Sequence, residues 1–298
     1  MIVVIGEILI DLFPDYQRIG GAPFNFAFHL KKLGFPVRLF TRVGADRHGQ
    51  HILDTLEAND FDVTDVQVDP SHPTGTVLVD LDGHGVPQFT IRPEAAYDFL
   101  DLGGDRMMVS LDADMLYFGT LLQRTEFGCR QVSEFLSHSG ASTLRFCDIN
   151  MRPPHVNIQA VGRSLRFTDL LKLNEDERDL IQRHFEGPTD MEAWLPWLME
   201  TFNIRTVALT RGSMGSRVYH EAEAIEAPPI EGVSVVDTVG AGDGYAAFLA
   251  AGYLRRLPWG QTLRQATRFA SQICSIPGAV PDSDQFYDEY DDLKWEGD

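Results

Sequence analysis

Asp237-Thr238-Val239-Gly240-Ala241-Gly242-Asp243-Gly244-Tyr245 is a glycine-rich stretch that follows a β-rich run, 233–236, and opens into an apolar run, 245–254. The pattern predicts a strand, a tight turn and a helix. The central glycines allow backbone N–H groups to surround an anion, and the helix start adds about half a positive charge. Asp243 puts a carboxylate into this positive spot. A phosphate cradle with its own base is the layout that phosphoryl transfer to a hydroxyl requires.

The same stretch has other interpretations. A strand, a glycine turn and a helix follow one another in many α/β proteins, and an aspartate near a helix start is a common cap. No Lys-Ser/Thr pair follows the glycines, which excludes a Walker A loop. Glycines at 240, 242 and 244, late in the chain, also fit a dinucleotide fingerprint poorly. The residues alone leave a structural turn and a phosphate-transfer site open.

Length and composition narrow the class of protein. With 298 residues, 44% hydrophobic and 23% charged, the chain can bury one large core. The sequence contains no run of about 18 apolar residues, so no membrane span is predicted. The N-terminal run resembles a buried strand more than a signal peptide. The net charge of −19 argues against a nucleic-acid partner. The three cysteines are far apart and follow no metal-ligand spacing, so we expect reduced thiols in a cytoplasmic protein.

The order of segments predicts an α/β fold in a single domain. β-rich and helical runs alternate, which requires a mostly parallel sheet with helices on both faces. Eight acidic residues and one lysine between 282 and 298 predict a solvated, partly disordered acidic tail. The β-rich runs are 2–5, 37–41, 114–118, 144–149, 170–173 and 207–210, and the helical runs are about 23–34, 47–59, 126–138, 189–202, 240–255 and 260–275.

One segment breaks the alternation. Runs 74–82 and 87–92 have strand character and flank Asp82-Gly83-His84-Gly85, a turn rich in residues that tolerate positive φ. We expect an antiparallel hairpin here. Together with 11–20 it would form a small sheet over the ends of the main strands.

Three motifs resemble those of the ribokinase-like (PfkB) carbohydrate kinases. Residues 237–243 resemble the C-terminal signature of that family, with Gly244-Tyr245 in place of a small residue and Phe. Gly20-Gly21-Ala22-Pro23-Phe24-Asn25-Phe26-Ala27 resembles the second signature. Asp148-Ile149-Asn150-Met151-Arg152 resembles the Asp-Pro-Asn-x-Arg segment of fructokinase-like members, with Ile149 replacing proline. The likeness extends over nearly the whole chain.

The resemblance implies ATP-dependent phosphorylation of a sugar hydroxyl, with the 6-hydroxyl of D-fructose as the first choice. Kinases of 2-keto-3-deoxygluconate, ribose or an aminoimidazole riboside, and a non-catalytic sugar-sensing protein on the same fold, are the alternatives. The small sheet, from about 11–20 and 74–98, would be a lid that excludes water. The protein would be a monomer or a homodimer through that lid.

The resemblance also assigns residues to roles. Asp243 would be the base, with Gly240, Ala241 and Gly242 as the anion hole. Mg²⁺ would meet Glu177 through water, and Asp237 lies where some members hold a monovalent cation, which makes K⁺ a candidate. By pattern alone Asn174 and Glu177 form a helix cap, and the arginines could be surface residues. The sugar ligands would be Asp11, Gly21, Asn25, Arg92, Asp148, Asn150 and Arg152, and the nucleotide ligands Asn174, Thr210, Arg211, Gly212, Gly215, Ser271 and Cys274.

Overall fold

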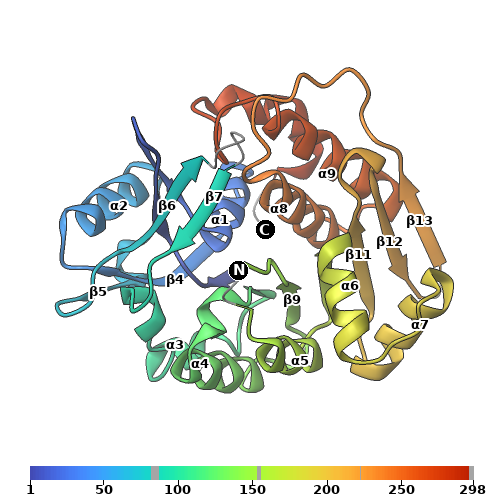
Figure 1. The fold of residues 1–298 in the computed structure, drawn as a ribbon, viewed down its shortest axis with the longest axis horizontal. Helices are drawn as coiled ribbons and strands as arrows, with labels where there is room; N and C mark the ends of the chain where they lie inside the picture. The colour runs from blue at the N-terminus through green and yellow to red at the C-terminus, as the bar shows by residue number, and fades with distance from the viewer. Residues whose placement is uncertain (82–86, 153–155, 222, 295–298) are drawn as a thin grey trace.

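A nine-stranded sheet forms the centre of the molecule (Figure 1). The structure, a computed structural model, describes residues 1–81, 87–152, 156–221 and 223–294. The strand order is β13-β12-β11-β10-β9-β8-β1-β4-β5, parallel from β11 to β5, with β12 and β13 antiparallel at one edge. The strands are β1 (Ile2–Ile5), β4 (Val37–Gly44), β5 (Val66–Asp69), β8 (Met115–Phe118), β9 (Leu144–Asp148), β10 (Leu170–Asn174), β11 (Thr206–Thr210), β12 (Ser216–His220) and β13 (Glu223–Ala227).

Helices cover both faces of this sheet, which confirms the predicted fold class. The α-helices are α1 (Ala22–Lys32), α2 (Arg47–Ala58), α3 (Asp105–Val109), α4 (Glu126–Ser137), α5 (Ile158–Arg166), α6 (Glu175–His184), α7 (Met191–Phe202), α8 (Ala241–Leu254) and α9 (Trp259–Ile273). Short 3₁₀ helices are η1 (Val63–Asp65), η2 (Ala96–Phe99), η3 (Leu121–Arg124), η4 (Gly212–Met214) and η5 (Asp284–Leu293). In the part of the chain that is described, none of the helices has both the length and the apolar character needed to cross a membrane.

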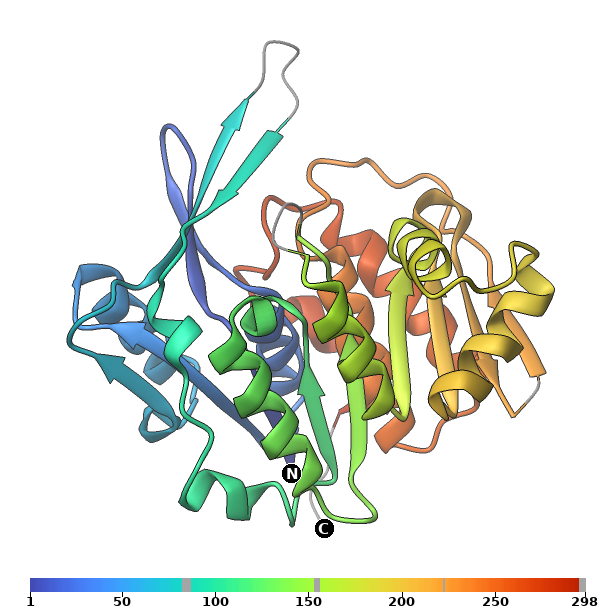
Figure 2. The same ribbon diagram turned by 60° about the horizontal axis from the view of Figure 1, so that its bottom comes forward.

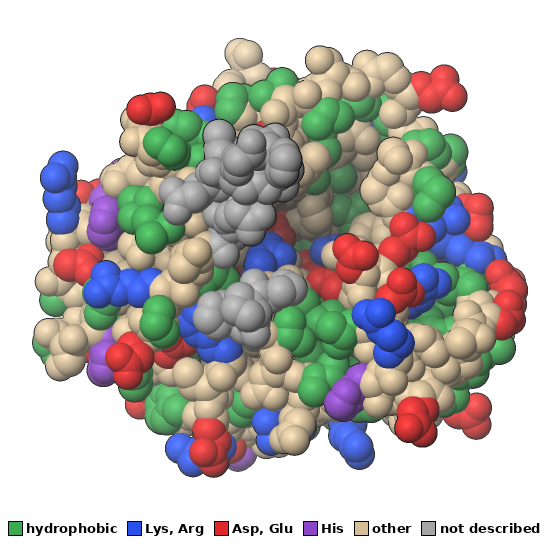
Figure 3. All heavy atoms as spheres, in the orientation of Figure 1, with side chains coloured by type: hydrophobic (Ala, Val, Ile, Leu, Met, Phe, Trp, Pro, Cys, Tyr) green, Lys and Arg blue, Asp and Glu red, His purple; other side chains and the backbone are tan. Residues whose placement is uncertain are grey.

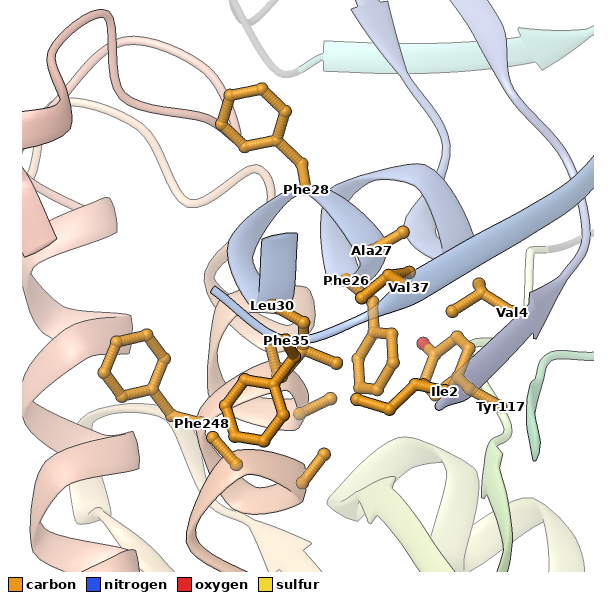
Figure 4. Packing of buried hydrophobic residues seen from close by; sticks show 14 of the residues in the cluster. Ile2, Val4, Phe26, Ala27, Phe28, Leu30, Phe35, Val37, Tyr117 and Phe248 are labelled. Atoms are coloured by element: carbon orange, nitrogen blue, oxygen red, sulfur yellow. The ribbon is translucent and has the colours of Figure 1, made fainter. Parts of the chain in front are cut away.

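Side chains of β1 alternate between two hydrophobic cores because successive residues of a strand point to opposite faces. Ile2 and Val4 belong to the core under α1, α8 and α9, where the rings of Phe26 and Tyr117 stack at 3.7 Å between centroids (Figure 4). Val3 belongs to the opposite core, with residues of α4, α5 and α7. Burial on both faces fixes the sheet between its helices.

The small sheet has the strand order β3-β2-β6-β7 and projects from the body of the molecule (Figure 2). It contains two antiparallel hairpins, β2 (Leu9–Leu12) with β3 (Gln17–Gly20), and β6 (Gly75–Leu81) with β7 (Pro87–Ile91). The hairpins join through a parallel pairing of β2 with β6. The predicted turn Asp82-Gly83-His84-Gly85 lies outside the described residues.

Two predictions about the C-terminal third are wrong. Residues 233–236 form no strand; Val235 and Val236 are 63% and 60% exposed on a loop that crosses the surface before α8. Residues 284–293 are not a solvated tail but the segment η5, whose Tyr287 and Tyr290 are buried against α1, α8 and α9. The aromatic residues face the core while the acidic side chains between them face water.

Tyr287 anchors the C-terminal segment to α1. Its hydroxyl shares a buried 2.7 Å hydrogen bond with His29 Nδ1. We expect Tyr287→Phe to lower the free energy of unfolding by about 1 kcal/mol, the net value of one such bond, in urea denaturation. Tyr16→Phe is the matched control, because Tyr16 is 52% exposed. Equal stability of the two variants would contradict an anchored C-terminus.

Candidate active site

The carboxyl ends of the parallel strands share one edge of the large sheet, where α/β proteins bind ligands. The molecular surface is hollowed near the middle of the face in Figure 3, and acidic and basic side chains lie in the hollow. Several of the predicted site residues lie at or just after the ends of β9, β10 and β11 at this edge. Their contacts show which of them can act together.

The first turn of α8 holds the predicted base. Gly240 is the N-cap residue with a φ of 77°, Ala241 begins the helix, and Asp243 lies in the first turn, 6% exposed. Gly240 packs so closely on Ala279 that a Cβ there would lie 2.3 Å from the Ala279 Cβ. The start of α8 thus places backbone N–H groups that lack partners within the helix next to Asp243 in the chain, although the Ala241 N–H donates to the Thr238 carbonyl at 3.4 Å.

The start of α1 brings a predicted sugar ligand to this base. Asn25 Nδ2 donates a 2.7 Å hydrogen bond to Asp243 Oδ2, although the two residues are 218 positions apart. Gly21, the N-cap of α1 with a φ of 110°, leaves room for the Glu7 carbonyl, 2.7 Å from where a Cβ would be. Asn25 Oδ1 is buried and has no hydrogen-bond partner among the described residues. The amide therefore orients the base and keeps an acceptor available.

Two carboxylates, Asp11 and Glu7, line the region between the base and the small sheet. Burial raises the pKa of Asp11 to about 6, which Arg152 opposes and Asp243 reinforces. Burial also raises the pKa of Glu7 to about 7; Arg152 again opposes the rise and Asp243 adds to it. Arg152 is thus within electrostatic reach of both groups. The sequence analysis did not single out Glu7, the residue that follows Gly6. Glu7 is 5% exposed.

The raised pKa of Glu7 predicts a pH-dependent stability. The folded state binds this proton more tightly than the unfolded chain, so the Glu7 contribution falls as pH rises from about 4.5 to 7. The melting temperature of Glu7→Gln, measured relative to that of the wild type, should therefore rise as the pH is raised from 5 to 8. The exposed Glu57→Gln is the control. Parallel melting curves for wild type and Glu7→Gln over this range would refute the assignment.

Asp148 lies in the interior of the protein, at the end of β9. Its side chain is fully buried and accepts hydrogen bonds from Lys172 Nζ, at 2.9 and 3.1 Å, and from the Tyr117 hydroxyl, at 3.2 Å. This differs from the predicted direct sugar contact. Lys172, which the sequence-based prediction missed, is its partner on the next strand. A lysine inside the apolar run 170–173 was the available signal.

The other sugar candidates are more exposed. Asn150, after β9, has a φ of 46°, a left-handed conformation that is uncommon outside glycine. Arg152 and Arg92 both have exposed side chains, the first after β9 and the second after β7 of the small sheet. The charge effects on Glu7 and Asp11 connect Arg152 to the site. The backbone of Arg92 donates to the Thr76 carbonyl and accepts from the Arg124 side chain.

Glu177 and Asn174 form a capping box at the start of α6. Glu177 accepts N–H bonds from Met151 at 2.8 Å and from Asn174 at 2.9 Å, and Asn174 Oδ1 accepts from the Glu177 N–H. Asp237 likewise accepts from the backbone of Val239 and Gly278, at 3.0 and 3.1 Å. Among the described residues no group of three or more His, Cys, Asp or Glu side chains is arranged to hold a metal ion.

The predicted nucleotide residues gather at the ends of β10, β11 and β12. Asn174 pairs with Thr210 across the sheet. The turn after Thr210 closes through a 2.9 Å bond from the Arg211 N–H to the Gly215 carbonyl, with positive φ at Gly212 and Gly215. The hydroxyls of Ser216 and Thr267, 3.0 Å apart, connect this turn to α9, which carries Ser271 and ends at Cys274.

Arg18 connects the small sheet to the loop after α9. It lies on β3, paired with Asp11 of β2, and its Nη1 donates a 2.5 Å hydrogen bond to the Pro277 carbonyl. The next residue, Gly278, donates to Asp237. No motif pointed to this arginine, because the contact depends on how the two sheets are placed.

Comparison with known proteins identifies the family of this chain. The sequence profile of the pfkB family of carbohydrate kinases matches residues 1–285. A fructokinase of Salmonella typhimurium is 28% identical over 293 residues, which cover 91% of this chain and 90% of that protein. The solved structure of an uncharacterised sugar kinase from Pyrococcus horikoshii has a TM-score of 0.81 at 24% identity and covers 98% of both chains. A fructokinase from Xylella fastidiosa with bound ATP has a TM-score of 0.82 at 22% identity over 93% of both chains. With a family match over almost all of its length, the chain belongs to the pfkB family of carbohydrate kinases.

Proposed function

We propose that this kinase transfers the γ-phosphoryl group of ATP to a sugar hydroxyl, and that its preferred acceptor is the 6-hydroxyl of D-fructose. The observation that carries the proposal is the buried Asp243 carboxylate at the open start of α8, oriented by Asn25. A base beside the N–H groups of a helix start matches the needs of a hydroxyl acceptor and a phosphoryl donor.

Asp243 would accept the hydroxyl proton as the new oxygen–phosphorus bond forms. Asn25 holds the carboxylate in place. The N–H groups of Gly240, Ala241 and Gly242 would stabilise the charge on the transferring group. Mg²⁺, carried on the ATP phosphates, would neutralise charge there. Both Glu177 oxygens already accept N–H bonds, so contact through a metal-bound water fits better than direct ligation.

The nucleotide would lie along the ends of β10 to β12 and α9, beside the Thr210–Gly215 turn. The ATP-bound Xylella fastidiosa fructokinase, which shares the fold, supports this donor. Glu7, Asp11 and Arg152 would surround the sugar below the small sheet, which would close over it as a lid. The free cysteines Cys129, Cys147 and Cys274 suit the reducing cytoplasm in which ATP is available.

The relatives and the charges of the site favour particular acceptors. The Salmonella typhimurium fructokinase supports D-fructose. The exposed Arg152, within electrostatic reach of Asp11, favours 2-keto-3-deoxygluconate as the second candidate, because an arginine can pair with its carboxylate. Ribose or an aminoimidazole riboside would use the hydroxyl contacts alone.

A comparison of acceptors tests the proposal. We expect kcat/KM with Mg-ATP to be at least about tenfold higher for D-fructose than for ribose, 2-keto-3-deoxygluconate or the riboside, the discrimination one unmatched polar contact can provide. Arg152→Ala separates the two leading acceptors. It should weaken turnover of the keto acid much more than that of fructose. A preference for the keto acid that Arg152→Ala abolishes would replace fructose as the acceptor.

A further inference from the structure

Lys172 is a buried charge beside the first turn of α8. It lies on β10, one strand from Asp148, and its side chain is 6% exposed. Asp148, fully buried, holds the ammonium group with both carboxylate oxygens, and the Tyr117 hydroxyl holds one of these oxygens. The ammonium group is therefore fixed in one position.

The position of this ammonium group is electrostatically unusual. A Cβ added to Gly242, in the first turn of α8, would lie 3.1 Å from Lys172 Nζ. A cation beside the positive end of a helix is unfavourable, since helix N-termini attract anions. Burial lowers the pKa of Lys172, but the carboxylates of Asp148, Glu177 and Asp243 outweigh it and raise that pKa above its ordinary value. The lysine thus stays charged next to the N–H groups of α8.

Stability alone does not account for this arrangement. A buried ion pair loses hydration on both charges, and an apolar pair of similar volume is often as stable or more so. Two positive features, the lysine and the helix start, converge where the proposed function places a doubly charged phosphoryl group. Asp243 adds a negative charge there, which would repel that group unless a cation compensated.

We propose that the Lys172 ammonium group contacts the transferring phosphoryl group together with the first-turn N–H groups of α8, and that Asp148 is its positioning residue, not a sugar ligand. This role rests on the proposed function. The acceptor oxygen forms a bond to the γ-phosphorus, and the bond from that phosphorus to the bridging oxygen breaks with its electron pair staying on ADP. The hydroxyl proton passes to Asp243, while Lys172 keeps its proton and supplies charge only.

Lys172→Met tests the contact because it keeps most of the length of the side chain and removes the charge. We expect kcat to fall about 10²–10³-fold, as for the loss of one oxyanion donor, with the sugar KM unchanged. By calorimetric titration, the affinity ratio of ATP over ADP should fall at least about tenfold, since one charge-assisted contact to the γ-phosphate is lost. An unchanged ratio would overturn the proposal.

Lys172→Met leaves the buried Asp148 without a cation, so a variant that removes both charges is the control. Asp148→Asn with Lys172→Met should melt close to the wild type and keep the low kcat and the low ATP-over-ADP ratio. Recovery of turnover in this double variant would overturn the proposal, because the only role of Lys172 would then be to neutralise the buried charge of Asp148. Asp148→Asn alone should lower kcat without raising the sugar KM. A raised KM with full kcat would show that Asp148 is a sugar ligand.

The binding ratio also separates this proposal from the proposed function. If the wild type transfers no phosphoryl group to a sugar but the ATP-over-ADP ratio still falls in Lys172→Met, the function is wrong and the phosphate contact stands. If the wild type binds no ATP, both proposals fail.

Discussion

Asp243→Asn is expected to lower kcat by about 10²–10⁴-fold, the range for loss of a general base. Asparagine has the same shape and can keep a hydrogen bond to Asn25, which donates to the carboxylate at 2.7 Å in the wild type. The fold and the binding of ATP should therefore survive. Because the amide cannot take the hydroxyl proton, the loss should appear in kcat and not in the sugar KM. Steady-state kinetics with Mg-ATP and D-fructose measure both.

Asp190→Asn is the matched control for this experiment. Asp190 also lies at the start of a helix, as the N-cap of α7, where it accepts an exposed N–H bond from Ala193. Its replacement should leave turnover unchanged. Near wild-type kcat in Asp243→Asn would show that another group accepts the proton, and would leave Asp243 as a helix-start residue only.

Gly240→Ala should reduce kcat by at least about 10²-fold, the cost of displacing catalytic groups by about 1 Å. A Cβ at this position would lie 2.3 Å from the Ala279 Cβ and 2.4 Å from the Ala279 Cα. The turn must therefore move, and the N–H groups at the start of α8 move with it. Turnover with saturating substrates and the melting temperature give the two readouts.

Gly232→Ala isolates the effect of backbone strain. Gly232 has a φ of 75°, close to the 77° of Gly240, but nothing lies within 4 Å of where its Cβ would be. Both variants should lose similar stability from the left-handed conformation, whereas only Gly240→Ala should lose turnover. Equal kcat in the two variants would contradict a catalytic anion hole at 240–242.

Most of the fold could be predicted from the sequence because local sequence patterns determine the order of its strands and helices. β-rich and helical runs alternate, and both faces of a parallel strand must be buried, so the arrangement of layers follows without tertiary information. The run 233–236 was misassigned because β-branched residues alone do not make a strand; within the described part of the chain, its valines pair with no strand. At the C-terminus, acidic composition concealed Tyr287 and Tyr290, which are spaced to face one side.

Site residues could be predicted only where they lie within a recognisable sequence motif. The glycine turn and Asp243 could be found from one short stretch, but the Asn25–Asp243 contact depends on how α1 and α8 pack. The pairing of Lys172 could not be predicted because a strand with one lysine is common. Its partner Asp148 is found only when the adjacent strand is known. The same packing buries Asp148 beside Lys172. Long-range pairing, and not local propensity, decides these roles.

The most direct test of the account is the product that the wild type forms from Mg-ATP and D-fructose. Phosphorus NMR and an ADP assay on the same sample identify the phosphorylated position and the amount of nucleotide consumed. We predict equal amounts of ADP and fructose 6-phosphate, with almost none of either from Asp243→Asn. ADP without sugar phosphate, or no transfer to fructose, ribose, 2-keto-3-deoxygluconate or an aminoimidazole riboside while ATP still binds, would contradict phosphoryl transfer to a sugar at this site.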